Sequence, residues 1–214
     1  MSEAFVIPRV KVCGLTRTAD ALHALAVGAD ALGFVFHPSS PRCATVEEVA
    51  AITTSLPGDV LTVAVLVEAT PKSAKELLES TGLRAVQLCG DQSAQDWVDF
   101  PVPILRRIGV GSGATVEIEN WEGIASVFLL DHPRSTGGSG QQVDRQLAGL
   151  LCQNAACMLA GGLDGTQVAR AIREVLPAGV DASSRLESSP GIKDLEAVRD
   201  FVTIARNTFK QLDS

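Results

Sequence analysis

Eight short, apolar segments alternate with amphipathic ones along the whole chain, and this alternation limits the possible folds more than any other feature. Several segments are almost continuously apolar, as in Leu61-Thr-Val-Ala-Val-Leu-Val67. Such segments are typical of strands that are covered on both faces, and therefore of a parallel sheet. The predicted strands are 10–13, 31–36, 61–67, 85–88, 104–108, 126–130, 156–160 and 179–182.

Helical patterns occupy the segments between these strands. Thr45 and Glu48 form a capping box for a helix that ends near Leu56, and Thr70 with Pro71 is a helix-start signal. Further amphipathic patterns predict helices at 18–27, 72–80, 142–152, 167–176 and 195–212, with weaker patterns after Asp91 and Thr115.

A strand followed by a helix, repeated eight times, predicts an α/β fold: a single (β/α)₈ barrel with an all-parallel sheet, spanning residues 1–214 as one domain. The chain is short for this fold, whose members run to about 250 residues, so most connecting loops must be minimal. An open doubly wound sheet is the alternative, since Gly109-Val-Gly111-Ser-Gly113 resembles a nucleotide-binding loop. That run follows the fifth strand rather than the first, so we expect a surface loop.

Composition argues against several classes of protein. A formal net charge of -7 disfavours sequence-independent binding to nucleic acid, and no apolar stretch is long enough for a membrane helix. The five cysteines include no Cys-x-x-Cys pair, which favours a reducing cytoplasm, and the three histidines lack the spacing of metal ligands. Since we find neither an export signal nor a large apolar helix face, we expect a cytoplasmic monomer, with a homodimer as the alternative.

Reactive groups follow two of the predicted strands. In a (β/α)₈ barrel the active site is built by the loops after the carboxyl ends of the strands. Cys13 and Asp131 follow the first and sixth strands and would face each other across the barrel mouth, an arrangement that suits a thiolate base and a carboxylic acid. A thiolate at neutral pH needs a nearby positive charge, and Lys11 projects to the same side of the first strand. The alternatives are a buried apolar role for Cys13 and a turn or helix cap for Asp131.

Three further loops contain groups that could bind anions. Gly161-Gly162 and Ser183-Ser184 follow the seventh and eighth strands, where such barrels most often hold a phosphate. Arg42, in a proline-stiffened loop, could hold a carboxylate in a bidentate fork. The competing interpretations are that the glycines only make turns and that Arg42 is a solvated surface residue. We expect a small phosphorylated substrate to bind at this end of the barrel.

Six runs of residues, spread over the chain, form a recognisable set. They are Lys11-Val-Cys-Gly-Leu-Thr-Arg17; Gly33-Phe-Val-Phe-His-Pro-Ser-Ser-Pro-Arg42; Val86-Gln-Leu88; Phe128-Leu-Leu-Asp131 with Gly137-Gly-Ser-Gly140; Leu159-Ala-Gly-Gly-Leu163; and Gly179-Val-Asp-Ala-Ser-Ser184 with Pro190-Gly-Ile-Lys-Asp194. In this order they resemble the phosphoribosylanthranilate isomerase family. Each run alone is modest support, but six in register across essentially the whole chain are highly specific.

The resemblance implies an enzyme of tryptophan biosynthesis that needs no cofactor or metal. Its reaction would be an Amadori rearrangement, in which N-(5-phosphoribosyl)anthranilate becomes 1-(2-carboxyphenylamino)-1-deoxyribulose 5-phosphate. The resemblance makes Asp131 the general acid that protonates the furanose ring oxygen, and Cys13 the general base that removes the proton from C2. It also implies substrate binding by Arg42 at the anthranilate carboxylate, by Gln87, and by Asp181 near the sugar, with the phosphate held by the backbone at Gly161, Gly162, Ser183 and Ser184.

Three positions depart from the family pattern. Cys89 stands where the family usually has His, Arg185 stands where a glycine usually follows the serine pair, and Gln141-Gln-Val-Asp144 lacks the usual aromatic residue. Arg185 could contact the phosphate or lie in solvent. Two other hypotheses stay open. One is a related phosphate-sugar barrel enzyme such as a pentose-phosphate epimerase, although its clustered metal ligands are missing here. The other is a phosphate-ligand binder that has lost turnover, or a divergent copy that acts on another arylamine riboside.

Overall fold

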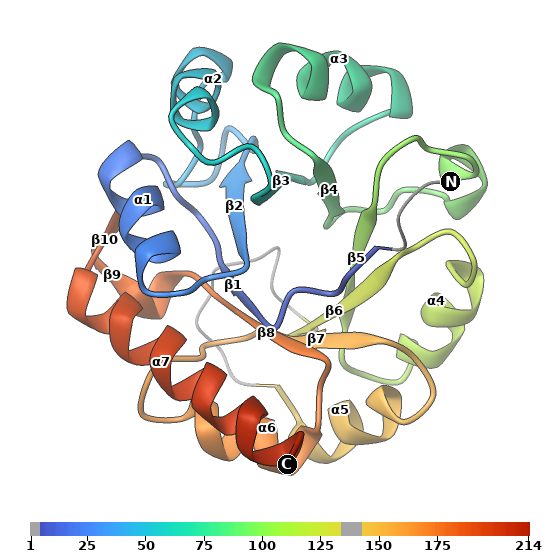
Figure 1. The fold of residues 1–214 in the computed structure, drawn as a ribbon. Helices are drawn as coiled ribbons and strands as arrows, with labels where there is room; N and C mark the ends of the chain where they lie inside the picture. The colour runs from blue at the N-terminus through green and yellow to red at the C-terminus, as the bar shows by residue number, and fades with distance from the viewer. Residues whose placement is uncertain (1–4, 134–142) are drawn as a thin grey trace.

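The fold is a closed ring of parallel strands with helices packed around its outside (Figure 1). The computed structural model describes residues 5–133 and 143–214. The strands of the ring are β1 (Val10–Val12), β2 (Ala31–Val35), β3 (Leu61–Leu66), β4 (Ala85–Leu88), β5 (Ile104–Gly109), β6 (Val127–Asp131), β7 (Cys157–Leu159) and β8 (Gly179–Ala182). Each predicted strand is found within one residue of its predicted ends.

The helices alternate with these strands. They are α1 (Thr18–Ala26), α2 (Val46–Thr54), α3 (Pro71–Thr81), α4 (Ala114–Asn120), α5 (Arg145–Cys152), α6 (Val168–Val175) and α7 (Leu195–Leu212), with short 3₁₀ helices η1 (Ala94–Trp97) and η2 (Ser184–Leu186). The chain after Asp91 forms only η1, so the prediction of an α-helix there was wrong. A hairpin of β9 (Glu187–Ser189) and β10 (Ile192–Lys193), which the sequence analysis did not predict, lies between η2 and α7.

The strands pair in chain order, and β8 pairs with β1 to close the ring. Val10, Lys11 and Val12 lie opposite Val180, Asp181 and Ala182 in this closing pair. The predicted (β/α)₈ barrel is therefore confirmed, and the open sheet is excluded. Because all strands are parallel, their carboxyl ends lie at the same end of the ring.

The helices α2 and α3 begin with the caps that the sequence predicts. In α2 the side chain of Thr45 accepts a hydrogen bond from the Glu48 N–H, while the Glu48 carboxylate accepts one from the Thr45 N–H at 2.8 Å. Thr70 caps α3, whose first residue is Pro71. Such caps satisfy backbone donors that have no partner within the helix, and so they set where each helix begins.

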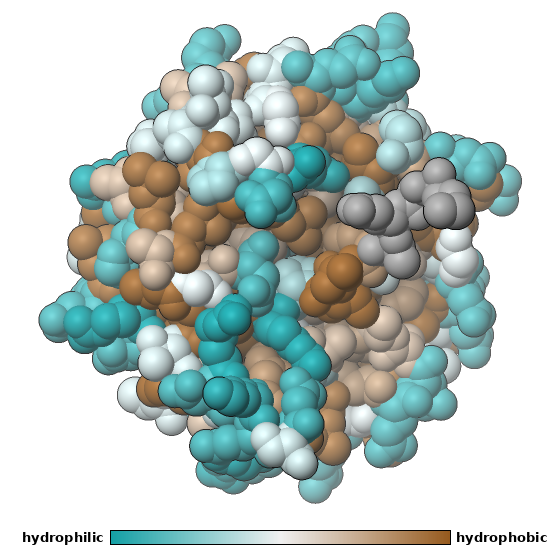
Figure 2. All heavy atoms as spheres, in the orientation of Figure 1, coloured by the Kyte–Doolittle hydropathy of each residue, from teal (hydrophilic) through white to brown (hydrophobic). Residues whose placement is uncertain are grey.

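Apolar side chains form two layers because neighbouring residues of a strand point to opposite faces. The outer layer lies between the strands and the helices. The inner layer fills the ring and consists of Val63, Ala85, Leu105, Val127, Leu129, Met158 and Ala160. Around these layers, the outline of the molecule is mostly hydrophilic in the view of Figure 2. In the described ranges, no helix combines the length and the apolar character needed to cross a membrane.

A polar cluster lies inside the ring near its carboxyl-terminal end. The Lys11 ammonium is fully buried and donates hydrogen bonds to Asp181 Oδ1 and Gln87 Oε1, both at 2.9 Å. Gly33 leaves the room that this cluster needs, since a Cβ there would lie 3.1 Å from Lys11 Nζ and 2.7 Å from Cys13 Sγ. Burying an ammonium requires a partner of opposite charge and good geometry, and the Asp181 carboxylate supplies both.

Candidate active site

One cavity of about 220 Å³ opens at the carboxyl ends of the strands. Its walls include every residue that the sequence analysis assigned to the site. These are Cys13, Arg42, Gln87, Asp131, Gly161, Gly162, Asp181, Ser183 and Ser184. They follow or end six different strands, so only the closed ring can bring them together. The two departures from the family pattern that the structure describes, Cys89 and Arg185, line the same cavity. The residues Gly137–Gly140 and Gln141, which the sequence analysis also singled out, lie outside the described residues.

Cys13 is held at the floor of the cavity directly after β1. Its N–H donates to the Ala182 carbonyl at 2.9 Å, and the residue is only 6% exposed. Burial raises the pKa of the Cys13 thiol above its ordinary value, and the nearby Lys11 and Lys193 ammonium groups act in the opposite direction without outweighing burial. The expected positive charge is therefore present, but burial outweighs it and favours the thiol form.

Lys11 stays charged although it is fully buried. Burial alone would lower the pKa of Lys11, but the attraction of Asp181 and of Cys13, together with their hydrogen bonds, outweighs it and raises the pKa. The ion pair with Asp181, at 2.9 Å, makes the largest contribution to this rise in pKa. A permanent cation thus lies below the cavity, balanced by one carboxylate.

Asp131 lies on the opposite wall at the end of β6 and is 6% exposed. Its Oδ1 accepts a hydrogen bond from the His132 N–H at 2.8 Å, and its Oδ2 lies 3.7 Å from Nε of Arg107. Arg107 also donates from Nη2 to the His132 carbonyl at 2.6 Å. The guanidinium therefore fixes the end of β6 and places a positive charge beside the carboxyl group.

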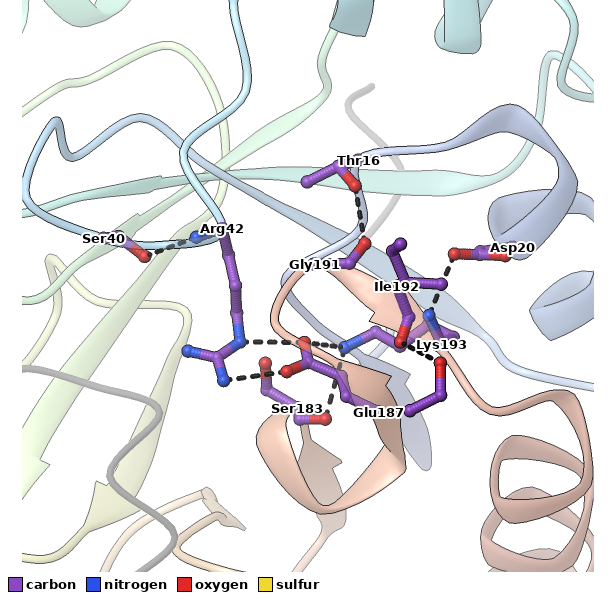
Figure 3. Close-up of polar contacts among 10 residues, drawn as sticks. Thr16, Asp20, Ser40, Arg42, Ser183, Glu187, Gly191, Ile192 and Lys193 are labelled. Carbon is purple, nitrogen blue, oxygen red and sulfur yellow. Dashed lines mark hydrogen bonds and ion pairs between the residues drawn. The ribbon is translucent and has the colours of Figure 1, made fainter.

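Arg42 is not the solvated residue that one interpretation expected. Its Nε and Nη2 donate to the two carboxylate oxygens of Glu187, each at 2.8 Å (Figure 3). Lys193 Nζ donates to the same carboxylate at 2.9 Å, so Glu187 lies between two cations. Burial would raise the pKa of Glu187, but hydrogen bonds from both cations outweigh it and hold the pKa below its ordinary value. No sequence pattern singled out Glu187, and Lys193 stood out only as part of the run Pro190-Gly-Ile-Lys-Asp194.

The loops after β7 and β8 both form part of the cavity wall. Gly161 and Gly162 have φ angles of 87° and 65°, a conformation that residues with a side chain rarely adopt. Ser183 accepts a hydrogen bond from Lys193 Nζ at its carbonyl, at 3.2 Å, and η2 begins at the next residue. The glycines do make a turn, and the turn faces the cavity. Arg185, the residue after Ser183 and Ser184, is exposed to solvent on the rim of the cavity.

The predicted binding residue Gln87 is already engaged within the protein. Its Oε1 accepts from Lys11, and its Nε2 donates to Cys89 Sγ at 3.3 Å. Burial raises the pKa of Cys89 to about 11, with the Gln87 hydrogen bond acting against it. Cys89 is therefore a neutral thiol that accepts a hydrogen bond from Gln87.

The chain is similar in sequence to proteins of known activity. Residues 10–204 match the family model described as N-(5'phosphoribosyl)anthranilate (PRA) isomerase. The N-(5'-phosphoribosyl)anthranilate isomerase of Myxococcus xanthus is 40% identical over 204 residues, which cover 93% of this chain and 96% of the relative. The isomerase of Rubrobacter xylanophilus is 40% identical over 210 residues, which cover 93% and 99%.

Solved structures agree with these relatives. The phosphoribosyl anthranilate isomerase of Thermotoga maritima superposes with a TM-score of 0.85 at 32% identity, covering 94% of this chain and 100% of that one. The Thermus thermophilus enzyme gives a TM-score of 0.84 at 32% identity, covering 93% and 98%. Matches in sequence, in fold and over nearly the full length of both chains show that this chain belongs to the N-(5'-phosphoribosyl)anthranilate isomerase family.

Proposed function

We propose that the chain catalyses the Amadori rearrangement of N-(5-phosphoribosyl)anthranilate to 1-(2-carboxyphenylamino)-1-deoxyribulose 5-phosphate in tryptophan biosynthesis. The observation that carries the proposal is the single cavity that collects a thiol, a carboxyl group and two small-residue loops. Family membership supports it. So does a related isomerase structure, 31% identical, that is in complex with reduced 1-(o-carboxyphenylamino)-1-deoxyribulose 5-phosphate.

The first step is ring opening, with Asp131 as the general acid. Its proton passes to the furanose ring oxygen as the C1–O bond breaks, and the nitrogen lone pair forms a C1=N iminium. A carboxylate remains on Asp131. The Arg107 guanidinium, 3.7 Å away, stabilises that negative charge and so favours release of the proton.

The second step is removal of the C2 proton, with Cys13 as the general base. The electrons of the C2–H bond move toward the iminium nitrogen and leave an enolamine, which becomes the ketose when C1 gains a proton and the C2 hydroxyl loses one. Because the iminium makes the C2 proton acidic, a modest base is enough. Burial raises the pKa of Cys13, and a cationic intermediate beside it would favour the thiolate.

The two ends of the substrate are the handles that place the sugar between these groups. The backbone at Gly161, Gly162, Ser183 and Ser184 is assigned to the phosphate. Arg42 is assigned to the anthranilate carboxylate through Nη1, since Glu187 occupies Nε and Nη2. Gln87 and Asp181 are assigned to the sugar. Binding energy from such remote groups is what orients the reacting carbon.

The test is turnover by matched variants, followed as the disappearance of phosphoribosylanthranilate fluorescence. We expect Cys13→Ala and Asp131→Asn to lower kcat by about 10²–10⁴-fold, with circular dichroism unchanged. Cys43→Ala is the control, since Cys43 is an exposed free thiol. Rescue of an isomerase-deficient tryptophan auxotroph gives a second readout. Full turnover by both variants would refute the assigned roles.

A protein that binds the phosphorylated substrate without converting it is the second candidate function. Cys89 and Arg185, the two described residues that depart from the pattern of the resemblance, both line the cavity and favour it. It predicts tight binding of the substrate by the wild-type chain and no loss of fluorescence.

We also propose that residues 1–214 act as one domain, as a monomer, in the cytoplasm. The Thermotoga maritima relative is described as dimeric, with monomers made from it, so a homodimer is the alternative outcome. Sedimentation velocity at micromolar concentration distinguishes the two by mass.

A further inference from the structure

Lys193 is a fully buried ammonium group next to the cavity, and the roles proposed above do not use it. Its side chain is 0% exposed. The ammonium donates to Glu187 Oε1 at 2.9 Å and to the Ser183 carbonyl at 3.2 Å (Figure 3). Burial lowers the pKa of Lys193, while Glu187 and Cys13 act to raise it. Such a cation is costly to bury, so its place in the fold calls for an explanation.

The hairpin of β9 and β10 holds Lys193 in place. Lys193 pairs with Glu187 across the hairpin, and its backbone N–H donates to Asp20 Oδ2 on α1 at 3.0 Å. At the turn of the hairpin, the Gly191 carbonyl accepts from Thr16 Oγ1 at 2.6 Å. These bonds attach the hairpin to the segment that follows Cys13, so the buried ammonium is brought to the first strand from the other end of the chain.

The wall next to Cys13 is built by the partners of this network. A Cβ at Gly14 would lie 2.6 Å from Cδ of Arg42 and 2.7 Å from Oγ of Ser183. Arg42 and Ser183 therefore pack directly against the residue after Cys13. Lys193 binds the carbonyl of Ser183 directly and reaches Arg42 through the carboxylate of Glu187, which the two cations share.

On the side of the cavity next to Cys13, three cations share two carboxylates. Lys11 is balanced by Asp181, whereas Arg42 and Lys193 share the single carboxylate of Glu187. Among the described residues, the charged and titratable groups nearest Cys13 are Lys11 on β1, Cys89 after β4, Asp181 on β8 and Lys193 on β10, with Arg42 and Glu187 beyond Lys193. The other such groups that line the cavity are His37 after β2, Arg185 on η2 and Asp131 at the end of β6, with Arg107 beside Asp131.

We propose that Lys193 is a positioning residue whose buried ammonium favours the thiolate of Cys13, and that Glu187 limits how much of this charge Cys13 experiences. The inference rests on the proposed function, in which Cys13 is the base. This role explains why the hairpin is attached so firmly. Because Glu187 and the Ser183 carbonyl hold the Lys193 ammonium, it stays in place when the Cys13 thiol loses its proton. Both lysines act to lower the pKa of Cys13 against burial, which agrees with this role.

The test measures how the alkylation of Cys13 by iodoacetamide depends on pH, with mass spectrometry of the peptide that contains Cys13. Only the thiolate reacts, so the midpoint reports its formation without any need for turnover. We expect Lys193→Met to move the midpoint up by about one pH unit, which is about tenfold slower reaction at lower pH. Glu187→Gln should move it down, because Lys193 loses its neutralising partner while side-chain volume is kept.

Two internal controls accompany these variants. Lys75→Met makes the same substitution at an exposed position of α3 and should leave the midpoint unchanged. The exposed thiol of Cys43, measured in the same digests, should react alike in all variants. In the isomerase assay, Lys193→Met should lose kcat at neutral pH and regain it as pH rises, which a purely structural defect would not do.

Midpoints that stay unchanged, or that move in the same direction in Lys193→Met and Glu187→Gln, would overturn the inference. If Lys193→Met does not fold, the downward shift in Glu187→Gln decides the question alone. The two proposals fail separately: full turnover by Cys13→Ala would refute Cys13 as the base even with the midpoints shifted, and unchanged midpoints with an inactive Cys13→Ala would refute only the role of Lys193.

Discussion

Replacing Gly33 with alanine tests how closely the inside of the barrel is fitted to its reactive thiol. Gly33 lies on β2, and a Cβ there would be 2.7 Å from Cys13 Sγ, 3.1 Å from Lys11 Nζ and 3.2 Å from Lys11 Cε. Ordinary contacts begin at 3.4 Å, so the sulfur would have to retreat by roughly 0.7 Å or more. Lys11 cannot give way at low cost, because its ammonium is bound to Asp181 and Gln87 at 2.9 Å.

These displacements set the expected magnitude. Overfilling a packed interior costs about 1–3 kcal/mol of stability. Misplacing a reacting group by about 1 Å costs about 100-fold in rate. Gly33→Ala should therefore lower the free energy of unfolding by about 1–3 kcal/mol, and kcat should fall on the order of 100-fold with a smaller change in KM.

Urea unfolding and initial-rate kinetics measure the two effects. The matched control is Gly58→Ala, at an exposed position where a Cβ would have nothing within 4 Å. This control should keep kcat and gain up to about 1 kcal/mol of stability, since alanine restricts the unfolded chain. If Gly33→Ala keeps both its unfolding midpoint and a kcat within twofold of the wild type, this would contradict the close packing of Gly33 against Cys13 and Lys11.

Three other substitutions test the charges of the site. Lys11→Met should lower the free energy of unfolding by about 3–5 kcal/mol, because it leaves the buried Asp181 carboxylate without its cation; adding Asp181→Asn should recover part of the loss in urea titrations, and a single variant as stable as the wild type would contradict this. Glu187→Gln should destabilise the protein at pH 7, and by progressively less as the pH is lowered below 4.5. The folded-state pKa of Glu187 is held below its ordinary value of 4.5, so its stabilisation is complete above that value and disappears as pH falls through the lower, folded-state pKa. Unfolding curves of the variant and the wild type that stay equally far apart throughout an acid titration would argue against it. Arg107→Met should lower kcat about tenfold, equivalent to about 1.4 kcal/mol, by removing the cation beside Asp131, and an unchanged kcat would exclude Arg107 from the acid step.

The position of the predicted site residues could be read from the sequence because the fold determines it. Cys13, Asp131 and Gly161 each lie at or just after the end of a strand whose apolar pattern is clear, and a parallel barrel puts all such ends at one opening. Arg106 and Arg107 stand out in the sequence by the same logic, at the end of the fifth predicted strand. Arg107 lies on the same face of β5 as the inward-facing Leu105, two residues earlier, and β5 pairs with the strand that ends in Asp131.

The network around Glu187 could not be predicted in this way. Its bond to Arg42 joins residues 145 positions apart, and it depends on a hairpin inserted after β8 that has no strong strand pattern. The charge state of Cys13 is a second example. The sequence shows a lysine on the same side of the strand, but the balance between that lysine and burial depends on depth inside the folded ring.

The seam between β1 and β8 has a consequence for synthesis of the protein. Lys11 and Asp181 are 170 residues apart, and the Cys13 N–H is bound by a carbonyl from β8. At about 5–20 residues per second, a growing chain would wait roughly 10 to 30 s between the emergence of Cys13 and that of its final neighbours. During this interval the thiol is reachable by oxidants and the ammonium has no counter-ion. The active site can therefore be complete only after β8 and the hairpin of β9 and β10, which lie near the carboxyl end of the chain, have been synthesised and the ring has closed.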